Sequence, residues 1–221
     1  MTPITPELLL QAYAVGLFPM AESAKDPTLH WIDPEERGII PLSDFHIPRS
    51  LKKSVLKGRY EIRIDTAFAR VINACAERTD DRRVTWINAT IKSLYIELQT
   101  RGHCHSVEAW EDNELVGGLY GVKMGAAFFG ESMFSRRTDA SKVALVHLVA
   151  RLNAGGFSLL DAQFMNDHLV QFGTLPVTRE QYKSILARAV AEKADFKSFA
   201  GDSDRHVVVY SATHGPSLTQ S

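Results

Sequence analysis

Residues 106–131 read SVEAWEDNELVGGLYGVKMGAAFFGE, and this stretch decides the fold. Its apolar segments, Ser106 to Trp110, Leu115 to Val122 and Ala126 to Glu131, are separated by short turns. The first turn, Glu111 to Glu114, contains Asp and Asn, which favour the tight turns of β-hairpins. Three strands joined by such turns predict an antiparallel meander.

The segments after the meander predict a crossover. A helix is expected from about Asp139 to Asn153, closed by Gly155 and Gly156, and an apolar strand from Phe157 to Ala162 follows it. A meander that continues into a strand–helix–strand crossover is typical of a mixed α/β sheet. The order resembles acetyltransferase-like folds, so we predict an acetyltransferase-like mixed sheet domain.

The N-terminal segment predicts a small α/β domain of its own. Thr5 and Pro6 suit the first positions of a helix, and Gly16 suits its end. We therefore predict a small N-terminal domain at residues 1–36 and the catalytic domain at residues 37–221. Further predicted elements are strands at 39–42 and 60–64 and helices at 48–57, 67–77 and 88–101.

The C-terminal part predicts one long helix and a loose tail. Thr178 and Gln181 have the spacing of a capping box, which predicts a helix that runs to about Ala194. The segment after Gly201 is polar, and we expect it to fray.

Composition indicates a globular chain. Of 221 residues, 45% are hydrophobic and 23% charged, which suits one domain with or without a small appendage. No run of apolar residues is long enough to span a membrane, and MTPITPELLL lacks the features of a signal peptide. Two cysteines form no disulfide framework. We expect a cytoplasmic protein without membrane contacts.

The net charge of −1 excludes a polycation, so nucleic-acid binding would need a local basic patch. One segment offers such a patch, with a single acid, Glu61, among its basic residues. A solvated helix face followed by a strand is the alternative interpretation. The basic residues are Arg49, Lys52, Lys53, Lys57, Arg59 and Arg63.

Several common motifs are missing from the sequence. Walker A, Gly-x-Gly-x-x-Gly, His-Glu-x-x-His and Gly-x-Ser-x-Gly patterns do not occur, so neither ATP nor a dinucleotide is expected. His103-Cys104-His105 leads into a strand, where alternate side chains point to opposite faces, so a metal is not expected there. Ser135 to Ser141 lacks the glycines with which acetyltransferases hold coenzyme A. No cofactor is predicted.

Two stretches contain polar residues in apolar surroundings. Glu131 lies within Phe128 to Phe134, where a buried carboxylate would need a partner; a strand-end acid that faces water is the alternative. Asp161 and Gln163 lie at the end of a predicted strand, on the same side, where α/β sheets usually bind ligands. Alternatively, Asp161 forms a structural ion pair and Asn166 caps a short helix.

These stretches resemble the leucyl/phenylalanyl-tRNA–protein transferases of bacteria, from about residue 8 to residue 185. One departure is Met20, where a Trp is frequent. The matching motifs are Ala12-Tyr13…Gly16…Phe18-Pro19, Trp31…Pro34…Arg37-Gly38-Ile39-Ile40-Pro41-Leu42, Thr85-Trp86-Ile87, Gly117-Gly118-Leu119-Tyr120-Gly121-Val122, Phe129-Gly130-Glu131-Ser132-Met133-Phe134-Ser135, Ala140-Ser141-Lys142…Leu145 and Asp161…Gln163…Asn166-Asp167-His168…Gly173.

The resemblance implies an aminoacyltransferase. Such an enzyme moves Leu or Phe, and less well Met, from aminoacyl-tRNA to the N-terminal Arg or Lys of a protein, which marks that protein for degradation by the N-end rule. The aminoacyl ester is already activated, so the enzyme mainly has to orient the two reactants. This explains why no energy-coupling motif is needed.

The resemblance also suggests roles for residues. Trp31 and Trp86 are candidates to stack on the 3′-terminal adenine, and Glu131 and Asn166 to hydrogen-bond the aminoacyl adenosine. The basic residues from Arg49 to Arg59 would contact tRNA phosphates. The expected apolar pocket for the amino-acid side chain is lined by Leu119, Phe128, Met133, Phe134 and Leu160.

Asp161 and Gln163 are the predicted catalytic residues, in one of two modes. Either Asp161 polarises Gln163, whose carbonyl oxygen accepts a proton from the attacking amine, or both only position the substrates and a ribose hydroxyl relays the proton. We favour the second mode because a neutral amide is a poor base.

Two rival functions remain at this stage. One is an acyl-CoA-dependent N-acyltransferase on the same fold, against which the missing glycine loop argues. The other is a tRNA-binding module in which Asp161 and Gln163 are only structural.

Overall fold

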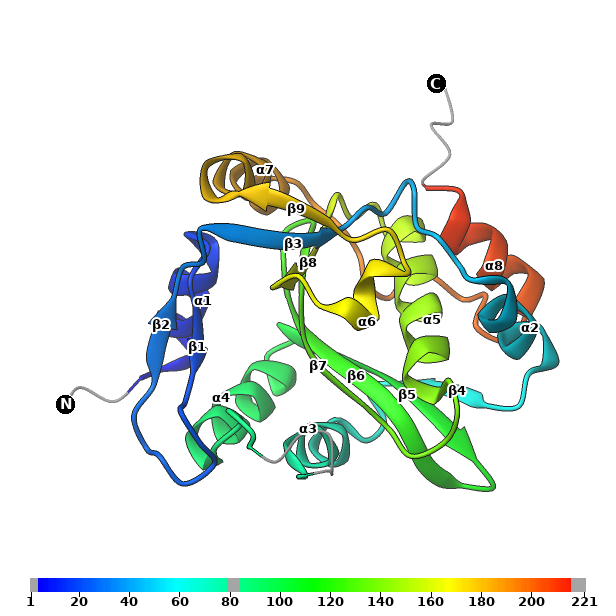
Figure 1. The fold of residues 1–221 in the computed structure, drawn as a ribbon, viewed down its shortest axis with the longest axis horizontal. Helices are drawn as coiled ribbons and strands as arrows, with labels where there is room; N and C mark the ends of the chain where they lie inside the picture. The colour runs from blue at the N-terminus through cyan, green and yellow to red at the C-terminus, as the bar shows by residue number, and fades with distance from the viewer. Residues whose placement is uncertain (1–3, 79–83, 216–221) are drawn as a thin grey trace.

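The structure is a computed structural model that describes residues 4–78 and 84–215. Its centre is a mixed sheet of seven strands in the order β4-β5-β6-β7-β8-β3-β9, with helices on both faces (Figure 1). The strands are β3 (Glu36–Ile40), β4 (Glu61–Ile64), β5 (Cys104–Glu111), β6 (Glu114–Met124), β7 (Ala127–Ser135), β8 (Leu159–Gln163) and β9 (Leu175–Thr178).

The predicted meander is confirmed. β5, β6 and β7 pair antiparallel along their lengths. The β5–β6 turn places Asp112 at φ 51° and Asn113 at φ 62°, the left-handed conformation that both side chains tolerate and that a two-residue hairpin requires. The local turn signal and the structure therefore agree.

The predicted crossover is also present. α5 (Ala140–Ala154) connects β7 to β8, and these two strands pair in parallel. β3 lies antiparallel to β8 on one side and to β9 on the other. The predicted acetyltransferase-like mixed α/β sheet is thereby confirmed.

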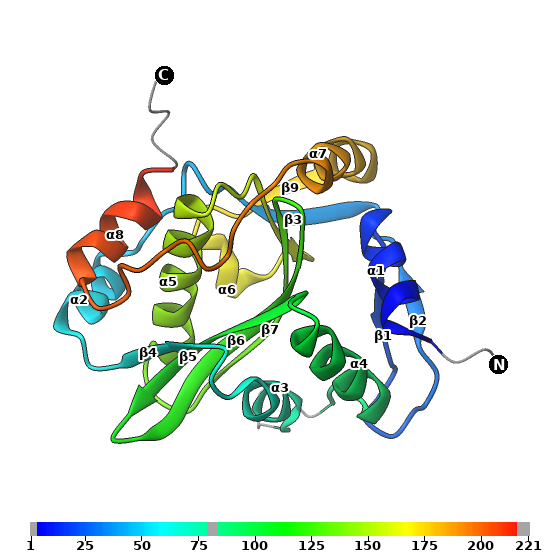
Figure 2. The ribbon, with the colours of Figure 1, turned by 180° about the vertical axis from the view of Figure 1, so that it is seen from behind.

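A small N-terminal region is placed beside the sheet at one end of the molecule (Figures 1 and 2). It consists of α1 (Pro6–Ala14) and the hairpin of β1 (Phe18–Met20) and β2 (His30–Ile32). Thr5 caps α1 through a hydrogen bond from the backbone N–H of Leu8, as the sequence predicts. The domain boundary after residue 36 stays a prediction.

The sheet separates two hydrophobic cores, because successive side chains of a strand face opposite ways. Phe128 and Phe129, both 0% exposed, point into different cores. The α5 core lies under α2 (Arg49–Lys57), α5 and α8 (Arg205–Thr213). The α4 core lies under α1, α3 (Phe68–Ala76), α4 (Ala89–Thr100) and α7 (Arg179–Ala191).

The prediction that the chain frays after Gly201 is wrong for residues 205–213, whereas residues 216–221 lie outside the described residues. α8 forms there, with Asp204 accepting hydrogen bonds from the backbone N–H groups of His206 and Val207. Val208 and Ala212 are fully buried against the α5 core. Val208, Val209 and Ala212 form a short apolar stripe at helical spacing, which the polar residues on both sides of it made hard to recognise in the sequence.

Short elements were also missed. β1, β2 and β9 have only three or four residues each, too few for a periodic pattern. α6 (Asp167–Val170) is the short helix of the alternative interpretation, in which Asn166 is the cap. β3 begins at Glu36, earlier than the predicted Ile39. Among the helices of the described residues, none has both the length and the apolar character that crossing a membrane requires.

Candidate active site

A β-bulge sets the direction of Glu131. In the β6–β7 pairing, Tyr120 lies opposite Ser132 and Gly121 opposite Gly130, so Glu131 is an extra residue in β7. Bulges bend a strand and re-aim a side chain, and they are frequent near active sites. Here the bulge turns the Glu131 carboxylate into the α4 core, where only 9% of the residue is exposed.

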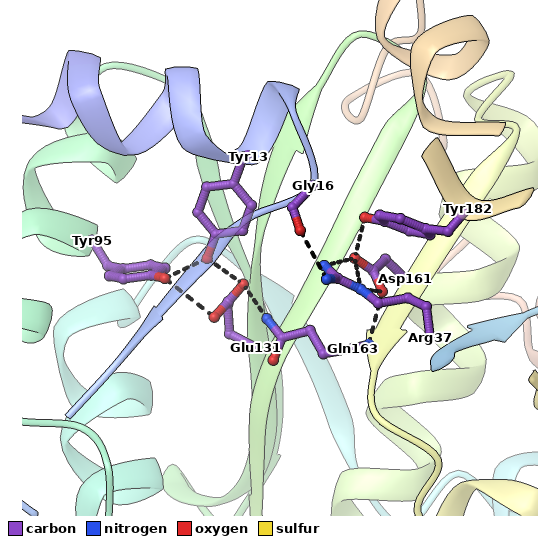
Figure 3. Close-up of polar contacts among 8 residues, drawn as sticks. All are labelled: Tyr13, Gly16, Arg37, Tyr95, Glu131, Asp161, Gln163 and Tyr182. Atoms are coloured by element: carbon purple, nitrogen blue, oxygen red, sulfur yellow. Dashed lines mark hydrogen bonds and ion pairs between the residues drawn. The ribbon is translucent and has the colours of Figure 1, made fainter. Parts of the chain in front are cut away.

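Three side chains from different elements donate hydrogen bonds to Glu131 (Figure 3). The Tyr13 hydroxyl of α1 lies 2.6 Å from Oε1, and the Tyr95 hydroxyl of α4 lies 3.2 Å from Oε2. The side-chain amide of Gln163, at the end of β8, donates to Oε1 over 2.9 Å. The hydroxyls of Tyr13 and Tyr95 also contact each other. The acid therefore has the partners that its burial demands.

The environment moves the pKa values of this cluster upward. Burial raises the pKa of Glu131 to about 7, although the hydrogen bonds from Tyr13 and Gln163 act in the opposite direction. Burial and the charge of Glu131 raise the pKa values of Tyr13 and Tyr95 well above that of a free tyrosine. Both hydroxyls consequently keep their protons, whereas Glu131 changes charge near neutral pH.

Asp161 is fully buried, and both of its oxygens are occupied. Oδ1 accepts hydrogen bonds from Arg37 Nε at 3.0 Å and from the backbone N–H of Gln163 at 2.7 Å. Oδ2 accepts from Arg37 Nη2 and from the Tyr182 hydroxyl, each at 2.7 Å. Asp161 thus contacts the backbone of Gln163, and the Gln163 amide turns to Glu131 instead (Figure 3).

Arg37, which is 1% exposed, connects Asp161 to other parts of the chain. Its Nη1 donates to the carbonyl oxygen of Gly16 over 2.9 Å. Its guanidinium lies 4.6 Å from the ring centre of Phe18 and 4.3 Å from that of Tyr182. Burial lowers the pKa of Arg37, but the hydrogen bonds and charge of Asp161 outweigh this effect and raise it.

A second bulge shapes the end of β8. Gly38 lies opposite Gln163 and Ile39 opposite Asp161, so Ala162 is the extra residue. Gln163 has φ 65°, in the left-handed region that a non-glycine residue seldom adopts. Gly38 is required beside it, since a Cβ there would lie 2.7 Å from the carbonyl oxygen of Phe164.

The residues predicted to form the apolar pocket are divided between the two cores. Leu119, Phe128 and Leu160 are buried in the α5 core, and the partly buried Met133 packs against it. Phe134 belongs to the α4 core, on the face of the sheet that carries Glu131. Four of the five predicted residues therefore share one face, and Met133 is the most accessible of them.

The other predicted substrate-binding residues lie apart from this cluster. Trp31 is on β2 and is 36% exposed, whereas Trp86 is partly buried against the α4 core. Asn166 caps α6, since its Oδ1 accepts the backbone N–H of His168 at 2.9 Å. The structure thus shows a capping role for Asn166 but no contact of it with Glu131.

The predicted tRNA-binding residues are all exposed. Four of them, Arg49, Lys52, Lys53 and Lys57, are on α2, which carries no acidic residue. Arg59 follows the helix and forms an ion pair with Glu111. α2 and α1 lie at opposite ends of the molecule (Figures 1 and 2).

A surface hollow of about 510 Å³ lies between β4, α3 and α4, beside Trp110. Arg63 and Arg70 contact the Trp110 ring within it. Apart from Arg63 of the basic segment, its lining contains none of the residues to which the sequence analysis gave a possible function. His105, in the neighbouring strand, pairs with Asp65.

Sequence reasoning missed Tyr13, Tyr95 and Tyr182 as parts of the site and gave Arg37 no role. The available signal was weak: Arg37 follows Glu35 and Glu36 and directly precedes Gly38-Ile39-Ile40, so its context is that of an ordinary charged segment before a strand. The tyrosines are indistinguishable by pattern from core residues, because each is on an amphipathic helix.

Comparison with known proteins gives two family matches. The family described as “Leucyl/phenylalanyl-tRNA protein transferase” matches residues 39–187, and its “N-terminal domain” matches residues 2–35. Two curated relatives are named “Leucyl/phenylalanyl-tRNA--protein transferase”. The relative from Paramagnetospirillum magneticum is 60% identical over 196 residues, 89% of this chain and 94% of the relative. The relative from Nitrobacter winogradskyi is 58% identical over 193 residues, 87% and 86% of the two chains.

Proposed function

Because the chain belongs to the leucyl/phenylalanyl-tRNA–protein transferase family, we propose that it moves leucine or phenylalanine, and less well methionine, from aminoacyl-tRNA to an acceptor protein. The acceptor begins with Arg or Lys, and the added residue marks it for degradation by the N-end rule in the cytoplasm. The observation that carries the proposal is 60% identity over 196 residues to a relative of that name.

The reaction needs orientation rather than an energy source. The α-amine nitrogen of the acceptor forms a bond to the carbonyl carbon of the aminoacyl ester, and the bond from that carbon to the ribose oxygen breaks. One proton leaves the amine and one reaches the ribose oxygen. Alignment of two bound reactants can supply about 7–11 kcal/mol of the barrier. The rigid hydrogen-bonded cluster around Glu131 and Gln163 suits this task.

The geometry favours the positioning mode over direct polarisation. Both oxygens of Asp161 are occupied by donors other than the side-chain amide of Gln163. The amide nitrogen of Gln163 binds Glu131, so its carbonyl oxygen points away from the acid (Figure 3). That oxygen accepts a hydrogen bond from the attacking α-amine, and the neighbouring ribose hydroxyl relays the proton to the leaving oxygen.

The amino-acid side chain binds against the apolar group formed by Leu119, Phe128, Met133 and Leu160. Leu119, Phe128 and Leu160 are buried, whereas Met133 is only partly buried. Entry of the amino-acid side chain therefore depends on displacement of Met133. An unbranched thioether adapts to both a leucyl and a phenyl group. Trp31 and Trp86 stack on the terminal adenine, and Glu131 and Asn166 hydrogen-bond the adenosine.

The tRNA acceptor stem lies along α2, where the exposed basic residues contact phosphates without reading bases. α2 carries four basic residues and no acid, which makes it a local positive surface on a chain with a net charge of −1. Arg59 contributes less than the others because Glu111 balances its charge.

The test is transfer of labelled Leu, Phe, Val and Ile from charged tRNA to a peptide beginning with Arg. The same peptide with an acetylated N-terminus is the control. Product from Leu and Phe, little from Val and Ile, and none with the blocked peptide is the expected result. Transfer from acyl-CoA but not from tRNA would support the acyltransferase rival, and tight tRNA binding without any transfer would support the binding module.

A further inference from the structure

We propose that Arg37 and Tyr182 are positioning residues for the transfer reaction, acting through Asp161 on the backbone of Gln163. The inference rests on the proposed function, because it concerns the same site. Among the described residues, neither side chain forms a hydrogen bond with Glu131 or with the side chain of Gln163. Asp161 is the residue through which hydrogen bonds connect both of them to Gln163.

The first step is the saturation of Asp161. Its two oxygens accept hydrogen bonds from two guanidinium nitrogens, one phenol and one backbone N–H. A carboxylate has about four acceptor sites, so none is left for a substrate amine. The residue is 0% exposed, which also keeps water away from these bonds. Asp161 is therefore an anchor and not a proton acceptor.

The second step is the conformation that this anchor holds. Gln163 has φ 65° directly after the bulge at Ala162. A non-glycine residue persists in such a conformation only when its surroundings determine it. The bond from its N–H to Asp161 Oδ1, 2.7 Å long, fixes this backbone together with the hydrogen bond from the Phe164 N–H to the Ala162 carbonyl oxygen, also 2.7 Å long, and the pairing with Gly38 of β3. This backbone orientation lets the side-chain amide reach Glu131 at 2.9 Å.

The third step is the rigidity of the anchor itself. Arg37 forms a bidentate ion pair with Asp161, and its Nη1 donates a hydrogen bond to the carbonyl oxygen of Gly16. The rings of Phe18 and Tyr182 lie against its guanidinium. The position of Gln163 is thereby set by β3, by the segment after α1 and by α7. Loosening either Arg37 or Tyr182 lets Gln163 leave its productive orientation.

The chain offers a matched control for a buried Arg–Asp pair. Arg151 binds Asp202 and the carbonyl oxygen of Phe196, and its guanidinium lies 5.4 Å from the ring of Phe196. The side chain of Arg151 is 5% exposed and that of Asp202 is 19% exposed, so this pair is also largely buried, and it has no hydrogen bond to Gln163 or Glu131 among the described residues. Tyr210, which is 59% exposed on α8, is the corresponding control for Tyr182.

The experiment compares single-turnover transfer from leucyl-tRNA by folded Tyr182→Phe and Arg37→Lys with the controls Tyr210→Phe and Arg151→Lys. The substitution Tyr182→Phe removes only a hydroxyl, so it keeps the test valid if Arg37→Lys does not fold. We expect each site variant to lower the maximal rate about tenfold, with unchanged affinity for leucyl-tRNA, as for one lost charge-assisted hydrogen bond. The controls keep the rate of the wild type, whatever their stability.

A double-mutant cycle identifies the route of the effect. If Tyr182 acts through Gln163, then Tyr182→Phe has no further effect in a Gln163→Ala background, and the loss in the single variant is the same across the pH range of the assay. Additive losses, or rates of the site variants equal to those of the controls, overturn the inference. If the wild type itself transfers nothing from leucyl-tRNA, the proposed function fails instead, so the two failures are distinguishable.

Discussion

At the scale of single residues, the site depends on acids buried among apolar side chains. Asp161 is balanced by Arg37, whereas Glu131 has only neutral donors. The sequence context predicted that Glu131 needs a partner if buried, and a structural ion pair of Asp161 was an alternative interpretation, but neither prediction named the partner. Arg37 and Asp161 are 124 residues apart, and Tyr13 and Glu131 are 118 apart. Such pairs follow from the tertiary fold and carry no local pattern.

The Glu131 carboxyl should make stability depend on pH. Its pKa is about 7 in the folded protein against 4.5 for the free group, so the folded state binds its proton more tightly. The stabilisation is therefore complete below pH 4.5 and is lost as the pH rises through 7, by about 3 kcal/mol in total.

Urea unfolding of the wild type and of Glu131→Gln at several pH values measures this effect. As the pH rises from 4.5 to above 7, the wild type should lose about 3 kcal/mol of its free energy of unfolding relative to Glu131→Gln, which has no carboxyl group to titrate at this position. Parallel pH profiles of the two proteins would contradict the assignment. A constant offset between them carries no information, because the new amide group changes the hydrogen bonds at every pH.

Met133 should matter for the donor amino acid. Met133→Ala removes a flexible contact from the apolar group beside Leu119 and Phe128, so kcat/KM for both leucyl-tRNA and phenylalanyl-tRNA should fall by roughly tenfold. Met124→Ala is the matched control, because Met124 is also partly buried but packs against the α4 core. Equal effects of the two substitutions would place the pocket elsewhere.

At the scale of elements, local signals predicted the long helices and the meander. The Thr178–Gln181 capping box and the Asp112–Asn113 turn are both present in the structure, because each depends on residues that are close in sequence. The bulges at Glu131 and Ala162 could not be predicted in this way. They are properties of the register between two strands, and they decide where Glu131 and Gln163 point.

The helix α8 gives a prediction for an element that sequence patterns missed. Val208 is 0% exposed and Val207 is 41% exposed on the same helix. Val208→Asp should lower the free energy of unfolding by about 3 kcal/mol or more, since it buries an unpaired charge, whereas Val207→Asp should change it by less than about 0.5 kcal/mol. Chemical denaturation measures both, and similar values would show that α8 does not pack on α5.

At the scale of the whole molecule, the site joins two parts of the chain that the sequence suggested were separate. Tyr13 of α1 donates a hydrogen bond to Glu131, and the carbonyl oxygen of Gly16 receives one from Arg37. The N-terminal region is therefore part of the site. The tRNA surface proposed on α2 lies at the other end of the molecule, so a bound acceptor stem would have to span the distance between them (Figure 1).

The α2 surface should determine the salt dependence of tRNA binding. Lys52→Glu combined with Lys53→Glu should weaken binding and reduce the slope of log K against log salt by about 1.4–1.8, since each of the two phosphate contacts contributes about 0.7–0.9. Lys193→Glu combined with Lys197→Glu is the control, with the same change of net charge at two other exposed lysines. An unchanged slope in the α2 variant would place the stem elsewhere.

The most direct measurement is single-turnover transfer of leucine from leucyl-tRNA to a peptide beginning with Arg, by the wild type and by folded Gln163→Ala. The wild type should form the peptide bond, and the variant should bind leucyl-tRNA with unchanged affinity but react roughly 100-fold more slowly, because the amine has lost the group that orients it. Equal rates for the two proteins would contradict the role of the bulged strand end in the reaction.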